Sequence, residues 1–187
     1  MSVQIAFGLK PKDAEIPDLI LRYHKTNSAD VALDANCLAA GERIRNGELS
    51  KEALRVIYRW KMDSWKYLGQ EQKYFDKNRD EDVSRALRRA IEAVKDQDIE
   101  RAFRDLQSLK GVAISVASAI LMAIFPEQFT VIDEMAFRAL GVPENPPLTV
   151  PLYLQYLDYC GAEAGRLGLC LRDMDRALWQ WGHEHPQ

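Results

Sequence analysis

Apolar residues recur along this chain every three or four positions, which is the spacing of amphipathic α-helices. Helices are predicted near 18–24, from Ser28 to about 46, after Ser50, across 83–94, after Asp98, and at 114–124, 133–140, 150–167 and 171–182. Gly69 to Asp82 has no such spacing and is predicted as a polar connector. Only Val3–Phe7 alternates in a way that could form a strand. The pattern therefore predicts an all-α fold.

Helix starts and stops support these boundaries. Ser28, Ser50, Asp98 and Asp133 stand where N-caps are expected, and a side-chain oxygen at that position accepts hydrogen bonds from the first free amides of a helix. Gly47 and Gly141 supply stops, because glycine adopts the left-handed conformation that ends a helix.

Composition indicates an ordinary globular protein. Hydrophobic residues make up 47% of 187 residues, which is enough to build a core. The longest apolar run, Val112–Phe125, is interrupted by Ser115 and Ser118 and is too short to cross a membrane. Met1–Lys12 lacks the basic-then-apolar order of a signal peptide. We therefore expect a cytoplasmic protein without a membrane partner.

Charge and cysteine content narrow the chemistry. The formal net charge is −3, but residues 51–110 carry 15 Lys and Arg against 12 Asp and Glu, so a local basic face is compatible with the sequence. Cys37, Cys160 and Cys170 have no C-x-x-C spacing, which argues against a zinc knuckle or a disulfide framework. No metal site and no cofactor are predicted.

Residues 106–120 have the layout of a helix-hairpin-helix. An amphipathic helix ends at Leu109, the tight turn Lys110-Gly111-Val112-Ala113 follows, and a helix of small residues begins. Such a turn directs backbone N–H groups and a helix N-terminus at one point, which suits a DNA phosphate. Lys110, Gly111, Val112, Ala113 and Ser115 are the predicted DNA-binding residues, although Lys110 alone could simply be solvated.

This arrangement resembles the helix-hairpin-helix/Gly-Pro-Asp DNA glycosylase superfamily of base-excision repair. The residues that carry the resemblance are Leu109, Gly111, Val112, Ala117, Pro126 and Asp133. Lys110 replaces the usual proline, Ala113 replaces the second glycine, and the C-terminal four-cysteine loop of some members is missing, so no iron–sulfur cluster is expected. The resemblance implies two joined helical lobes, one of residues 25–130 and one of 1–24 plus 131–187, with DNA in the cleft between them.

The resemblance also implies a catalytic role for Asp133. Members with lyase activity carry a lysine 18 positions before the aspartate, where this chain has Ser115. A serine there is similar to the monofunctional branch, which removes the base and leaves the strand intact. Asp133 could instead serve only as a helix cap.

Trp60 and Lys61 are further candidates, because the corresponding region of the resembled family faces the DNA and the base pocket. The alternative is that Trp60 belongs to the core and Lys61 to the surface. The function predicted overall is a monofunctional DNA N-glycosylase that removes a damaged or modified base, flipped from double-stranded DNA. A non-catalytic helix-hairpin-helix protein that binds nucleic acid or another protein, and an enzyme acting on a modified nucleoside, remain as alternatives.

Overall fold

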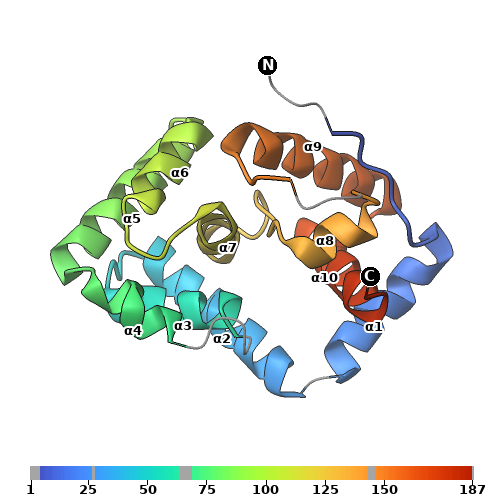
Figure 1. The fold of residues 1–187 in the computed structure, drawn as a ribbon, viewed down its shortest axis with the longest axis horizontal. Coiled ribbons are helices and arrows are strands. Elements are labelled where there is room, and N and C mark those ends of the chain that lie inside the picture. Colours follow the sequence, from blue (N-terminus) through green and yellow to red (C-terminus); the bar gives the residue numbers. More distant parts are fainter. Residues whose placement is uncertain (1–4, 27, 64–68, 143–145, 187) are drawn as a thin grey trace. The chain divides into compact units, whose positions relative to one another are not determined.

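The computed structural model describes residues 5–26, 28–63, 69–142 and 146–186, most of them helical (Figure 1). The α-helices are α1 (Ile16–Thr26), α2 (Ser28–Arg45), α3 (Lys51–Lys61), α4 (Gln70–Lys73), α5 (Asp80–Lys95), α6 (Ile99–Gln107), α7 (Ile114–Ile124), α8 (Glu134–Ala139), α9 (Val150–Leu167) and α10 (Leu171–Glu184). Short 3-10 helices are η1 (Asp13–Glu15) and η3 (Phe75–Lys77). The described residues contain no strand, which confirms the all-α prediction.

The capping pattern read from the sequence is present at several helix starts. Ser50 accepts the Ala53 N–H at 3.1 Å to begin α3, and the Asp98 carboxylate accepts the Arg101 N–H at 3.0 Å to begin α6. These caps satisfy amides that a helix cannot satisfy by itself.

The structure settles the local conformation of two segments that the sequence left open. Of the candidate strand Val3–Phe7, residues 3 and 4 lie outside the described residues, and Ile5–Phe7 is not a strand. The chain just after it donates hydrogen bonds to the end of α8, from Gly8 N to Leu140 O at 2.9 Å. A single extended segment has no partner strand in this helical fold. The polar connector 69–82 is not wholly irregular, because it contains α4 and η3 and the first turn of α5.

The chain divides into two compact units, Leu33–Phe125 and Met1–Ala32 with Pro126–Gln187. In the first unit, α7 is the central element and packs against α3 and α6. Ten of its eleven residues are buried. Gly41 on α2 has no room for a side chain because the backbone of Ala123 lies against it.

In the unit formed by the two ends of the chain, α10 packs against both α1 and α8. Its core includes Ile16 and Leu19 of α1, Phe137 of α8 and Tyr156 of α9. No helix among the described residues is both long and apolar enough to span a membrane.

Candidate functional site

The turn between α6 and α7, residues 108–113, brings the predicted hairpin residues together. Gly111 has a φ of +83°, a conformation that side chains rarely adopt. A Cβ at Gly111 would lie 3.0 Å from Tyr58 Oη and 3.1 Å from Tyr74 Cβ. The turn therefore needs glycine both for its backbone conformation and for its close approach to α3 and to the segment before η3.

Asn78 fixes this turn from a distant part of the chain. Its buried side chain accepts a hydrogen bond from Lys110 N at 2.8 Å and donates one to Lys110 O at 2.9 Å. The same amide nitrogen donates to Phe75 O at 2.8 Å. Nothing in the sequence marked Asn78, because it lies 32 residues before Lys110 in a stretch that reads as polar surface.

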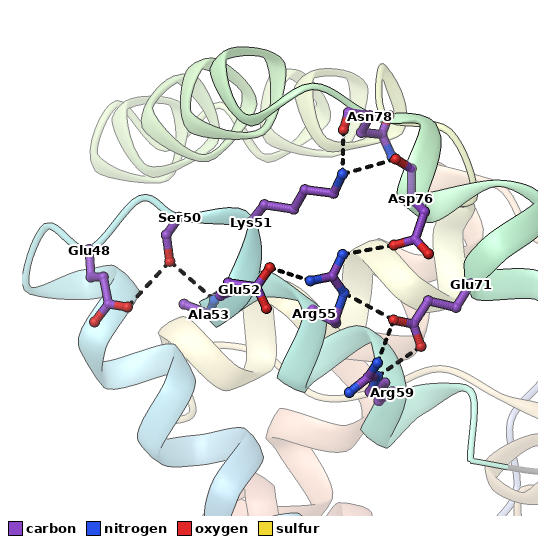
Figure 2. A network of polar contacts seen from close by, with 10 residues as sticks. All are labelled: Glu48, Ser50, Lys51, Glu52, Ala53, Arg55, Arg59, Glu71, Asp76 and Asn78. Atoms are coloured by element: carbon purple, nitrogen blue, oxygen red, sulfur yellow. Dashed lines mark hydrogen bonds and ion pairs between the residues drawn. The ribbon is translucent and has the colours of Figure 1, made fainter.

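A network of charged side chains holds the segment that carries Asn78 (Figure 2). Lys51 at the start of α3 donates to Asp76 O at 2.9 Å and to Asn78 O at 2.6 Å. Arg55, one turn further along α3, pairs with the Asp76 carboxylate at 2.7 Å and with Glu71 of α4 at 3.0 Å. The start of α3 is thus linked through η3 and Asn78 to the backbone of the turn.

The backbone amides of the turn fall into two groups. Lys110 N–H is used by Asn78, and Val112 N–H donates to Leu109 O at 3.2 Å, so Val112 is not the free donor that we expected. The amides of Gly111, Ala113, Ile114 and Ser115 have no acceptor among the described residues. Ala113 occupies the N-cap position of α7 and supplies no side-chain acceptor.

The electrostatics of this helix start favour an anion. The first turn of α7 contains no acidic residue, so the partial positive charge of the helix N-terminus is not compensated within it. Lys110 is exposed and forms no ion pair with the part of the chain that the structure describes. Free amides, a helix N-terminus and an ammonium group therefore occur in one short segment.

Asp133 begins α8 in the other unit. Its Oδ1 accepts the Ala136 N–H at 3.0 Å, so the capping role considered from the sequence is present in the structure. The side chain is half-buried. A capping carboxylate is held in place by the backbone of its own helix, which gives Asp133 a fixed orientation.

The connector before Asp133 is anchored by two buried tyrosines of α9. Tyr153 Oη donates to Thr130 O at 3.0 Å, and Tyr156 Oη donates to Val131 O at 2.8 Å. Burial raises the pKa of Tyr156 well above its usual range, so the phenol remains a neutral donor. These bonds fix the two residues of the connector that come shortly before Asp133.

Packing against α10 fixes the other side of α8. Gly182 lies so close to the backbone of Met135 that a side chain there would collide with it. Arg138 donates to Gly182 O at 2.6 Å and pairs with Glu134 at 3.0 Å. Asp133 therefore sits on a short helix that is held at its start and along its length.

Two further candidates from the sequence, Trp60 and Lys61, lie at the end of α3. Both are in its last turn and are half-buried. They are on the same helix as Tyr58, whose hydroxyl lies close to Gly111. Among the described residues, no group of His, Cys, Asp and Glu side chains could hold a metal ion.

No protein-family model matches this chain, and neither the curated proteins nor the solved structures include a match to it. Its function is therefore inferred from the chemistry of its own residues. The two features that carry chemistry are the open start of α7 beside Lys110 and the capping carboxylate Asp133 at the start of α8.

Proposed function

We propose that this protein is a monofunctional DNA N-glycosylase that binds a DNA phosphate at the turn between α6 and α7 and uses Asp133 in base removal. The observation that carries the proposal is the set of unbonded amides at Gly111 and Ala113–Ser115, beside the exposed Lys110. Several unbonded amides within one short segment suit a phosphate better than a neutral ligand.

Binding through this turn is independent of base sequence. Backbone amides and a lysine contact phosphate oxygens, which are the same at every nucleotide, so the turn positions the DNA without reading it. Asn78 contributes by holding the turn, since both polar backbone atoms of Lys110 are bonded to its side chain. The free amides are thereby presented by a turn with a fixed backbone.

Asp133 supplies the charge that base removal requires. Cleavage of an N-glycosidic bond develops positive charge on the sugar, and a carboxylate beside it stabilises that charge and orients the attacking water. Capping uses one carboxylate oxygen of Asp133 in a hydrogen bond and leaves its negative charge in place. The damaged base must leave the stack before this step.

Ser115 sets the reaction type. A lyase forms a Schiff base between a protein amine and the sugar, and the serine hydroxyl has no amine to offer. The expected product is an intact strand with an abasic site. Borohydride is accordingly expected to trap no protein–DNA adduct, and an adduct that persists after blocking the N-terminal amine would contradict the monofunctional assignment.

A second candidate function is a non-catalytic binding module. The capping bond of Asp133 favours it, because that bond alone accounts for an aspartate at this position. Binding by the turn is common to both functions, and catalysis separates them.

The deciding experiment is incubation with a panel of duplexes, each carrying one damaged or modified base, followed by alkali and gel analysis. The enzyme is expected to give alkali-dependent strand breaks with at least one duplex and none with the unmodified control. Binding to the duplexes without any alkali-labile product would support the non-catalytic module instead.

A further inference from the structure

A polar depression of about 440 Å³ lies beside the turn, in the unit of residues 33–125. It is formed by η3, by the part of α5 up to Arg89, and by the end of α6 with the residues that follow. The residues lining it are Lys77, Asn78, Arg79, Asp82, Arg85, Ala86, Arg89, Asp105, Ser108 and Lys110. Its volume is within the range of sites that bind ligands.

Positive charge dominates this depression although the chain as a whole is acidic. Five of its lining residues are Lys or Arg and two are Asp. Within the part of the chain that the structure describes, Lys77, Arg89 and Lys110 form no ion pair, and all three side chains are exposed. Elsewhere arginines are commonly neutralised, as Arg59 is by Glu71 and Arg166 by Asp13. The depression therefore keeps cations available for an external anion.

Asp82 offsets part of this charge. Its carboxylate pairs with Arg79 at 2.8 Å and with Arg85 at 3.2 Å. The hydrogen bond from Arg79 lowers the pKa of Asp82, so the carboxylate remains ionised at neutral pH. Replacing Asp82 by a neutral residue should therefore make the depression more attractive to an anion.

The elements that carry the cations of the depression are fixed by buried residues. Asn78 and Ala86 are buried, and Asn78 is the residue that also holds Lys110 in the turn. Arg85 and Arg89 are four residues apart on α5, so they extend from the same face of one helix. The cations are thus carried by a 3-10 helix, a long α-helix and an anchored turn.

The kind of nucleic acid is indicated by what the depression lacks. Sites for single strands combine cations with aromatic side chains on which bases stack. None of the described residues that line this depression is aromatic, and the sole apolar one is Ala86. A duplex keeps the faces of its bases stacked inside and carries its phosphates on the outside, which matches a lining of cations without aromatic rings.

We infer that the backbone of double-stranded DNA continues from the turn across this depression, where Lys77, Arg85 and Arg89 contact further phosphates of the duplex. The inference rests on the proposed phosphate-binding role of the turn and adds a second set of contacts to the backbone of the duplex. Lys110 belongs to the turn and also lines the depression, so the two sets of proposed contacts are adjacent.

The test is the affinity of the full chain for a labelled, unmodified duplex, measured by fluorescence anisotropy between 50 and 200 mM salt. Lys77→Gln and Arg89→Gln are each expected to weaken binding about eightfold at 0.1 M salt and to reduce the salt slope by about 0.9, the value for one lost phosphate contact. Lys95→Gln is the matched control, since Lys95 is an exposed residue at the end of α5 that does not line the depression. It is expected to bind like the wild type.

Asp82→Asn provides the opposite test, because it is expected to tighten duplex binding and to steepen the salt slope. A single strand of equal length is expected to bind more weakly than the duplex, and inorganic pyrophosphate to compete only at concentrations far above that of the duplex. Unchanged affinity in Lys77→Gln, Arg89→Gln and Asp82→Asn would overturn the inference, as would tighter binding of the single strand or efficient competition by pyrophosphate.

The failure of the proposed function gives a different result. If a carboxylate placed at Ala113 leaves duplex binding unchanged, the turn is not the phosphate site and the proposed function fails. If that variant loses binding while the depression variants match the wild type, only the path across the depression is wrong. Thermal unfolding of every variant shows whether a loss of binding reflects a loss of fold.

Discussion

The starts of α7 and α8 differ in whether a side chain caps the first amides of the helix. Both helices begin with amides that the helix cannot bond internally. At α8, Asp133 accepts the Ala136 N–H and adds a negative charge to the positive end of the helix. At α7, Ala113 offers no acceptor, the first turn has no acid, and Lys110 adds positive charge three positions before the N-cap.

The difference is that α7 begins without the stabilisation that a capping side chain would provide. An Asp, Asn or Ser cap is typically worth about 1 kcal/mol relative to alanine. The start of α7 lacks that stabilisation, and a bound anion would supply it by accepting hydrogen bonds from the uncapped amides. The start of α8 already has a side-chain cap and a negative charge of its own, and we expect Asp133 to act on a substrate through that charge.

The largest effect is expected from Asp133→Asn. Asparagine keeps the size and the capping oxygen but removes the charge, so the fold and the affinity for DNA should persist while excision falls about 10²–10³-fold, or ~2.7–4 kcal/mol. Single-turnover excision and DNA affinity are measured side by side on both proteins.

Asp133→Ala serves as the control for this change. It is expected to lose excision to the same degree and also about 1 kcal/mol of unfolding free energy, because the cap is gone. If the Asn variant retains excision within a few-fold of the wild type, Asp133 is a cap and the catalytic part of the proposal is wrong.

Ala113→Asp converts the start of α7 into a start like that of α8. The new carboxylate should cap the helix and raise the unfolding free energy by about 1 kcal/mol, while it occupies the amides and repels phosphate. Duplex affinity is expected to fall by about tenfold to a hundredfold, equivalent to roughly 1.4–2.8 kcal/mol. A melting curve and a binding isotherm measure the two effects.

Ala113→Ser separates capping from charge. Serine caps without a negative charge, so it should gain stability and lose less affinity than the aspartate variant. A result in which Ala113→Asp gains stability and still binds duplex DNA like the wild type would remove the turn from the binding site.

Asn78→Asp tests the clamp on the turn. Aspartate keeps the acceptor for Lys110 N–H but cannot donate to Lys110 O, and leaving that carbonyl without this partner costs about 1–3 kcal/mol. Chemical denaturation should show this loss, with weaker duplex binding under conditions in which the variant is still folded. Wild-type stability in this variant would mean that Asn78 is dispensable to the turn.

Lys110→Ala is expected to have the smallest effect. Loss of one phosphate contact should weaken duplex binding about eightfold at 0.1 M salt and reduce the salt slope by about 0.9, equally for all DNA sequences. Stability should stay near the wild-type value because the side chain is exposed. An unchanged slope would show that Lys110 is simply solvated.

Features set by neighbouring residues could be predicted from the sequence. Ser50, Asp98 and Asp133 were identified as caps from the helical spacing that follows each of them, and the structure places a capping bond at all three. The limits of α7 were also predicted, because its apolar run ends at Pro126 and begins after Gly111. Local rules suffice where the partner lies within one helical turn.

Features that depend on tertiary contacts could not be predicted. Asn78 and Lys110 are 32 residues apart, and only the fold brings them together. The basic depression collects cations from η3, α5 and the turn, none of which forms a basic run in the sequence. Val112 N–H was predicted to face a phosphate, and the structure instead uses it within the turn, which no residue pattern indicated.

The contrast between the two kinds of helix start is tested most directly by amide NMR of the full chain during titration with a short unmodified duplex. We expect the amide resonances of four residues to shift when the duplex is added, because these N–H groups have no acceptor among the described residues: Gly111, Ala113, Ile114 and Ser115. The Ala53 amide in the same unit, already bonded to Ser50, is expected to stay in place. Large shifts elsewhere in the chain with none at those four amides would contradict the account.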